Sequence, residues 1–270
     1  TGSVNASGTG ILTLDAANTF SGGLTLASGA SIKAGSVDAA VSGSAVTSSA
    51  FGAGAITING GTIYGNSGLV ASGDISINSD FAVNSGAAGG VNSRLFLAGS
   101  IDMGGATRTV SLGGYDTASS VVTSGGESLK FQTNGLTSAF TNGTIRFVRD
   151  SGGGASDYAA VRFDVNTGNF TDGAGLVIGE NVITTLGSSF VFNYSDGRPQ
   201  VSVEADGYFN LSDEVNARNA SIQLLSGSGT VTSLASSAAT STLTILPDAG
   251  DNGVFSGQIV DGSSLTGLVG

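Results

Sequence analysis

The feature of this sequence that most constrains its fold is a three-residue unit, apolar-x-apolar, that recurs between glycines and asparagines. In a β-strand the two outer side chains of such a unit point to one face and the middle one to the other. The pattern therefore predicts many short strands, each with one buried face. The units are residues 12–14, 24–26, 56–58, 75–77, 81–83, 95–97, 101–103, 110–112, 129–131, 145–147, 161–163, 190–192, 201–203, 209–211, 222–224 and 243–245.

Strands of three to five residues are not stable alone, but they become stable if each pairs with an equivalent strand one coil away. Corners such as Asn59-Gly60 and Asp206-Gly207 tolerate the positive φ that tight turns require. No window of a dozen residues carries a capped amphipathic helical stripe. We therefore predict an all-β parallel β-helix (β-solenoid), one elongated rod over residues 1–270. A coil of ~20 residues gives roughly 13 coils and a rod ~65 Å long.

The chain between residues 136 and 225 is more charged and aromatic than the rest, and holds 15 of the 29 charged residues. Much of the Phe and Tyr content also lies there, including Phe190, Phe192, Tyr194, Tyr208 and Phe209. We interpret this region as a wider part of the same solenoid, and a binding face is the alternative. A β-sandwich remains open for part of the chain, because hairpin turns also use Asn-Gly.

The charge balance excludes several classes of partner. The formal net charge is −11, and Lys33 and Lys130 are the only lysines, so we expect no binding to nucleic acid. Without cysteine and histidine there is no thiolate or imidazole metal site, and we expect no cofactor. No stretch approaches the ~20 apolar residues of a membrane helix, so we expect no membrane insertion by this segment.

Residues 7–23 (SGTGILTLDAANTFSGG) resemble the autotransporter-associated β-strand repeat, whose pattern runs G-x-G-x-L-T-L-x-G-x-N-T-Y/F-x-G-G. Two departures are mild: residues 15–17 are DAA where the family has a small-Gly-small step, and Leu24 stands where Thr is common. The resemblance implies a right-handed β-helix. It also implies a passenger region of a large secreted or surface-anchored bacterial protein, with no catalytic residues. We therefore expect an extracellular or bacterial cell-surface location.

The two ends of the sequence read as parts of one passage. Residues 253–259 (GVFSGQI) are similar to the lead-in of another copy of the repeat, and residues 1–23 are similar to that copy. A free-standing solenoid needs polar caps, and neither end carries a recognisable one. We therefore expect one period of a tandem array, or a subunit that stacks end to end on copies of itself.

One cluster of charged residues is a candidate ligand face, with surface glycans as the ligand class. In a coil of ~16 residues Arg146 would stack on Arg162, and Asp164 would separate the two cations. We interpret the cluster as a solvated ionic ladder, and a sugar-binding or catalytic face is the alternative. The members are Arg146, Arg149, Asp150, Asp157, Arg162 and Asp164.

A second acidic segment, residues 248–253 (DAGDNG), loosely resembles a calcium loop but lacks the terminal bidentate Glu, so it favours a turn.

Taken together, the sequence predicts a structural surface protein rather than an enzyme: a stalk, a fibre subunit or an adhesin passenger segment. The alternative is a carbohydrate-binding or polysaccharide-cleaving β-helix.

Overall fold

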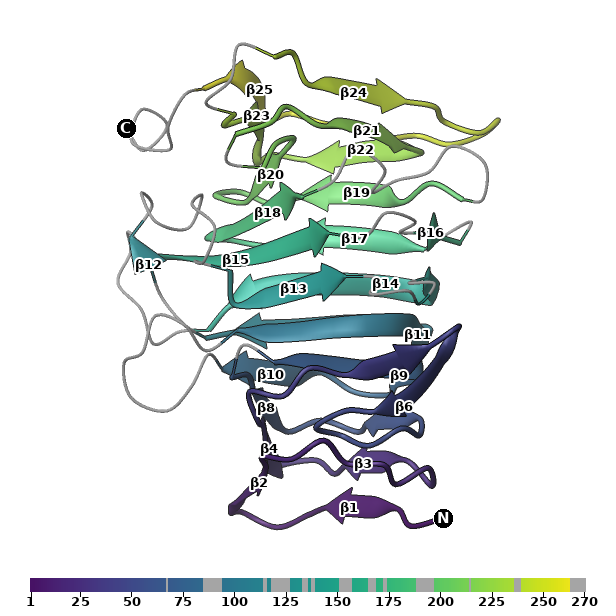
Figure 1. Cartoon of the computed structure of the whole chain (residues 1–270). Helices are drawn as coiled ribbons and strands as arrows, with labels where there is room; N and C mark the ends of the chain where they lie inside the picture. Colours follow the sequence, from purple (N-terminus) through teal and green to yellow (C-terminus); the bar gives the residue numbers. More distant parts are fainter. Residues whose placement is uncertain are drawn as a thin grey trace.

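A computed structural model of the chain describes residues 1–66, 68–84, 94–113, 116–117, 127–132, 136, 139–150, 157–164, 169–171, 174–187, 197–213, 215–235 and 239–262. This part of the chain is all-β and contains no helix. Most strands belong to one 21-stranded sheet whose pairings are nearly all parallel. The strands lie in layers stacked one above another, with the N-terminus at one end of the stack and residues 242–261 at the other (Figure 1). The described residues include no helix of the length and apolarity needed to cross a membrane.

Three parallel ladders run along the stack, and between residues 69 and 186 the chain visits all three in a fixed order. The first ladder begins with β1 (Val4–Ala6), β3 (Leu24–Leu26), β7 (Ile56–Ile58) and the end of β9 (Leu69–Ile77). It continues through the middle of β11 (Leu95–Leu112), the start of β14 (Ala139–Arg149) and β16 (Asn169–Phe170). One column of this ladder reads Val4, Leu24, Ile56, Ile75, Ile101, Phe140 and Phe170.

The second ladder holds β2 (Ile11–Leu14), β4 (Ser31–Ala34), β8 (Thr62–Tyr64), β10 (Phe81–Asn84), the end of β11, the end of β14, β17 (Gly175–Ile178), β19 (Gln200–Val203) and β22 (Leu224–Gly227). The third holds the starts of β9 and β11, then β13 (Leu129–Gln132), β15 (Asp157–Asp164), β18 (Val182–Leu186), β20 (Tyr208–Asn210), β23 (Thr230–Ser233) and β25 (Gln258–Asp261).

The remaining strands stand apart from the three ladders. β21 (Asn219–Ile222) and β24 (Thr242–Ile245) form a separate parallel pair, which precedes the second-ladder position in the last two layers. β5 (Ala40–Ser42) and β6 (Ala45–Ser48) form an antiparallel hairpin. β12 (Asp116–Thr117) pairs antiparallel with the start of β15.

The layers differ in length, so the predicted coil length applies to only part of the stack. Ile11 pairs with Ser31 in a short first layer, whereas Val110 pairs with Phe147 across a much longer stretch of chain. Near the C-terminal end the layers are shorter again, and Val203 pairs with Gly227. Strand pairing fixes only the short ladder segments, and the connections between them are free to vary because loop closure costs little extra per added residue.

The alternating units become strands with the buried faces that the sequence predicts. β7 (ITI), β13 (LKF at residues 129–131) and β19 (VSV at residues 201–203) each bury their outer side chains and leave the middle one half-exposed. Most of the buried apolar side chains form one cluster that extends from Ala6 to Val231, and the others form two smaller clusters. The predicted units 12–14 and 243–245, at the two ends of the stack, do not bury their outer side chains fully. Residues 222–224 are split between β21 and β22, and residues 190–192 lie outside the described part.

The aromatic content of the 136–225 region is largely internal where it is described. Phe140 stacks on Phe170 with ring centroids 4.6 Å apart, and Phe131 stacks on Phe163 at 5.1 Å. Phe209 and Tyr208 are also buried, whereas Phe190, Phe192 and Tyr194 lie outside the described residues. Stacked rings in successive layers gain contact beyond simple burial.

A buried carboxylate holds the connection between β20 and β21. The backbone N–H groups of Val215 and Asn216 donate to Asp213 Oδ1 at 3.0 and 2.6 Å, and Arg218 forms an ion pair with the same carboxylate. Burial by itself raises the pKa of Asp213, but the hydrogen bonds from Asn216, Val215 and Arg218 outweigh it and leave the pKa below its ordinary value of 3.8. The folded state therefore favours the ionised carboxylate.

We expect Asp213→Asn to destabilise the fold by about 1 kcal/mol at pH 7, because it removes a charged acceptor from several donors. A carboxyl with a lowered folded pKa stabilises above its unfolded pKa and loses that stabilisation as the pH falls below it. The difference between wild type and variant should therefore shrink as the pH drops below 3.8. Urea unfolding at pH 7 and pH 3 measures it, and a difference that grows at pH 3 would contradict the assignment.

Candidate functional site

The predicted charged cluster divides between two ladders. In the third ladder Lys130 lies directly beside Arg162 in the next layer, and Arg162 lies beside Thr185. Asp164 bridges the two cations: its Oδ2 lies 2.5 Å from Lys130 Nζ and its Oδ1 lies 3.3 Å from Arg162 Nη2. The sequence predicts Asp164 between Arg146 and Arg162, whereas the structure places it between Lys130 and Arg162.

Aromatic and glycine neighbours shape this ionic group. Lys130 Nζ lies 5.5 Å from the ring centroid of Phe96, the residue beside Lys130 in the preceding layer. A Cβ placed on Gly187 would come 1.8 Å from Asp164 Oδ1 and 2.6 Å from Arg162 Nε, so glycine leaves the room for this pair. All three charged side chains are about four-fifths buried, at 17–23% exposure. The ladder is therefore packed against the surface rather than fully solvated.

Arg146 lies in the second ladder, between Thr109 and Val177. Its Nε and Nη2 donate to the two carboxylate oxygens of Glu204 at 2.9 and 2.6 Å. Glu204 directly follows β19, so this bidentate pair spans the layer of Val177 that lies between β14 and β19. The hydrogen bond to Glu204 raises the pKa of Arg146 further above its ordinary value, against the opposing effect of burial. This bidentate ion pair therefore links two layers that are not adjacent.

The predicted stacking of Arg146 on Arg162 is wrong. The layer repeat at this point runs from Ile145 to Leu176, which is about twice the spacing between the two arginines. The step from Arg146 to Arg162 therefore leads from the second ladder to the third. As a result Phe147 and Phe163 face each other across the core, with ring centroids 6.4 Å apart.

The other predicted members lie at the ends of these strands. Arg149 pairs with Leu112 at the end of β14, and the backbone N–H of Asp150 donates to Leu112 O at 3.0 Å. Asp157 opens β15, and its side chain is outside the described part. The structure brings Arg162 and Asp164 together with Lys130, and it gives Arg146 a separate partner in Glu204. In both places a carboxylate neutralises a cation of another layer.

Asp164→Asn should destabilise the fold by about 1 kcal/mol, because it leaves Lys130 and Arg162 side by side without a carboxylate between them. We expect the loss to be largest at low ionic strength, where repulsion between the two cations is least screened. Chemical denaturation with urea in low and high salt measures it. Gln132→Ala, which changes the side chain beside Asp164 in the preceding layer, is the uncharged control. A salt-independent loss equal to that of the control would contradict the bridging role.

The acidic segment at residues 248–251 is a turn, as predicted. The N–H of Asp251 donates to Asp248 O at 3.1 Å. Gln223 Nε2 donates to a carboxylate oxygen of each aspartate at 2.9 Å, and Arg198 Nη2 lies 3.2 Å from Asp248 Oδ1. The described residues contain no group of three acidic side chains placed to hold a metal ion.

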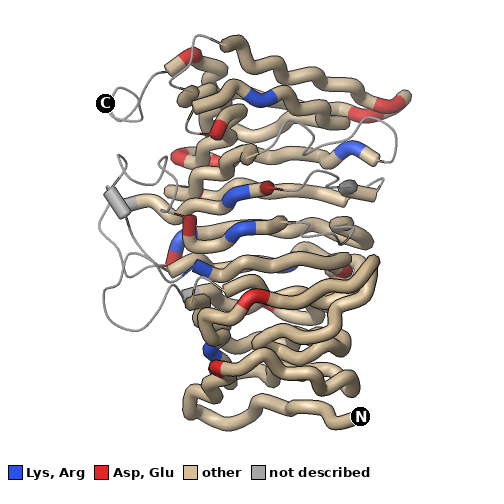
Figure 2. The backbone as a smooth tube through the Cα atoms, viewed as in Figure 1, with Lys and Arg blue, Asp and Glu red and all other residues tan. Residues whose placement is uncertain are grey.

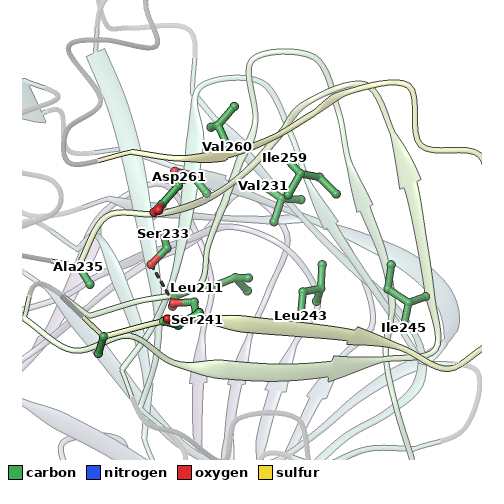
Figure 3. A pocket seen from close by; sticks show the side chains of 13 residues that line it. Leu211, Val231, Ser233, Ala235, Ser241, Leu243, Ile245, Ile259, Val260 and Asp261 are labelled. Atoms are coloured by element: carbon green, nitrogen blue, oxygen red, sulfur yellow. Dashed lines mark hydrogen bonds between the residues drawn. The ribbon is translucent and has the colours of Figure 1, made fainter. Parts of the chain in front are cut away.

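A feature that the sequence does not reveal is a cavity at the C-terminal end of the stack, lined by both apolar and polar side chains. It measures about 600 Å³ and lies between β23, β24 and β25. Figure 3 shows Val231, Leu243, Ile245 and Ile259 around it, with a hydrogen bond of 2.8 Å between Ser233 and Ser241 at its edge. Ile259 is 67% exposed and nearby Val254 is 77% exposed.

The opposite end of the stack also presents apolar side chains. In β2, Ile11 is 52% exposed and Leu12 is 37% exposed, although Ile32, beside Leu12 in the next layer, is fully buried. Among described strands β1 pairs only with β3, and β2 pairs only with β4. The outer backbone edges of these two strands therefore face away from the stack. Apolar side chains of the kind that fill the core inside the stack are therefore exposed to solvent at its two ends.

Comparisons of this chain with models of protein families, with curated proteins and with solved structures found no match.

Proposed function

We propose that this chain is a segment of a right-handed parallel β-helix that serves as a rod-like stalk in a bacterial surface protein, with neighbouring repeats or other copies continuing the stack. The observation that supports it most is the unbroken register from layer to layer, in which one apolar column passes through Val4, Leu24, Ile56, Ile75, Ile101 and Phe140. Such a ladder builds an elongated structure from few residues per layer. We propose a right-handed coil because connections between parallel strands of one sheet are nearly always right-handed.

The distribution of charge agrees with a structural role. Arg146 is bound by Glu204, and Lys130 and Arg162 share Asp164, so these cations tie layers together. The resemblance of residues 7–23 to the autotransporter-associated repeat supports an extracellular setting on a bacterial surface. In that role the protein carries load, and each layer resists unfolding through its backbone pairing with the next.

Pulling the chain by its two ends in a force spectrometer tests the stalk proposal. A layered solenoid should unfold in steps, and each step should release the residues of a layer. At ~3.5 Å per residue, a short layer of about 20 residues lengthens the chain by about 70 Å and a long layer of about 37 residues by about 130 Å. Release of the whole chain in a single step would contradict the proposal, and so would specific binding or cleavage of a polysaccharide at Arg146 or Arg162.

A further inference from the structure

The two ends of the stack have complementary edges. At the C-terminal end β24 pairs only with β21 and β25 only with β23, among described strands. At the N-terminal end β1 and β2 are likewise paired on one side. All four pairings are parallel, so a second copy placed on the C-terminal end in the same orientation presents its first strands as the next layer. An open parallel edge is a template for another strand.

The inward positions of the two edges match. β21 turns Ala220 and Ile222 into the core, and these residues lie beside Leu243 and Ile245 of β24. β1 turns Ala6 into the core with Val4 packed against it, and β1 lies beside β3 in that orientation. Continuation of the ladder therefore places Val4 over Leu243 and Ala6 over Ile245. The outward residues Asn5 and Thr244 then lie side by side.

Charge disfavours an association in which two C-terminal ends meet. Residues 1–14, which include β1 and β2, contain no charged side chain. At the C-terminal end, Asp261 lines the cavity, and Asp248 and Asp251 lie in the turn that follows β24. Two C-terminal ends brought together would oppose these carboxylates, whereas an uncharged N-terminal end meets them without repulsion. Figure 2 shows that charged residues are sparse in the first layers.

We infer that the C-terminal end of one copy binds the N-terminal end of a second copy, with β24 pairing in parallel with β1 and the ~600 Å³ cavity closed by the incoming layer. The inference rests on the stacked solenoid proposed above and names its partner and register. The two contact surfaces differ and lie at opposite ends of the stack, so each added copy presents a new free end and the association adds copies in a line. The apolar side chains that it covers include Ile245, Ile259, Leu12 and Val4.

Sedimentation of the full chain over a range of concentrations tests the association. We expect the mean mass to rise past that of a dimer as the concentration increases. Ile259→Asp should weaken the association at least tenfold, because it places a carboxylate on the covered surface. Val215→Asp is the matched control: Val215 is 55% exposed but does not line the cavity, so its variant should associate as the wild type does. Both positions are exposed in a single copy, so both variants should keep the wild-type melting temperature.

Disulfide trapping tests the register. Neighbouring parallel strands lie about 4.8 Å apart, within reach of a disulfide, and the native chain has no cysteine to interfere. Oxidation of the double variant Asn5→Cys/Thr244→Cys should give a ladder of trimers and longer species. Each single variant should give no species beyond a dimer. Equal cross-linking of Asn5→Cys alone would point to N-terminal ends meeting each other and would overturn the inference.

Two further outcomes would also overturn it. One is a wild-type chain that stays monomeric at all concentrations. The other is association that appears only in a variant ending at Gly262, which would mean that residues 263–270 of the same chain cover the C-terminal end. If layered unfolding under force is observed in either case, the stalk proposal stands and only the self-association fails.

Discussion

Replacement of Phe140 by alanine is expected to lower the free energy of unfolding by about 3–5 kcal/mol. Phe140 is fully buried at the centre of the stack, where the first ladder passes from aliphatic to aromatic residues. Its ring lies 4.6 Å from that of Phe170 in the next layer, 5.1 Å from Phe131 and 5.7 Å from Phe163, centroid to centroid. Alanine leaves a cavity bordered by three rings, and each ring is held by its own strand and cannot collapse into it.

Urea unfolding followed by circular dichroism measures this loss, with Thr141→Ala as the control. Thr141 is the next residue of β14, and its side chain is half-exposed. The control removes only the hydrogen bond that Thr141 Oγ1 donates to Ile101 O at 3.3 Å, so it should lower the free energy of unfolding by about 1 kcal/mol or less. A Phe140→Ala variant whose free energy of unfolding stays within about 1 kcal/mol of the wild type would mean that the aromatic column is not packed as described.

Gly99→Ala is the second change with a large expected effect, a loss of about 3 kcal/mol or more. Gly99 lies at the corner of β11 where the chain leaves the third ladder for the first, and its φ is 135°. A Cβ there would come 1.8 Å from the backbone oxygen of Ser72 in the layer before. The variant must strain its backbone and also push two layers apart, and backbone atoms cannot rotate out of the way.

Gly73→Ala gives a matched control one residue from the same contact. Gly73 lies in β9 beside Ser72, and a Cβ there meets no atom within 4 Å. We expect its melting temperature to remain close to that of the wild type, while Gly99→Ala melts many degrees lower. Thermal unfolding of the two variants side by side decides the matter. Equal stability of both would show that the layers are not in contact at this corner.

The sequence allows the strands to be predicted because burial alternates within them. Residues 56–58 and 129–131 need only their own side chains to reveal which face is buried. β18 gives no such signal, because all five of its residues are buried and show no alternation. β11 reads as three separate units, since the sequence does not reveal that one strand of 18 residues bends around corners at Gly99 and Gly104.

The order of the layers is less predictable than the strands. Which strand pairs with which depends on connections whose lengths range from tight corners to long excursions, and the sequence does not mark where a layer ends. For that reason the spacing of Arg146 and Arg162 suggests adjacent layers, although it in fact joins two ladders of one layer. That Asp164 neutralises Arg162 is predictable from their separation by one residue on a strand, but its second partner Lys130 is not, because that pairing depends on the order of the layers. The sequence also predicts ends without caps, but it does not reveal which apolar side chains they expose, because Ile259 and Leu12 read like any other core residue.

An experimental density map of the isolated chain, by crystallography or electron cryo-microscopy, tests most directly whether the short strands survive by parallel stacking. The account predicts Leu24, Ile56, Ile75 and Ile101 in a single column, on parallel strands about 4.8 Å apart, with Phe140 next in line. Two facing antiparallel sheets, with these residues scattered between them, would contradict it.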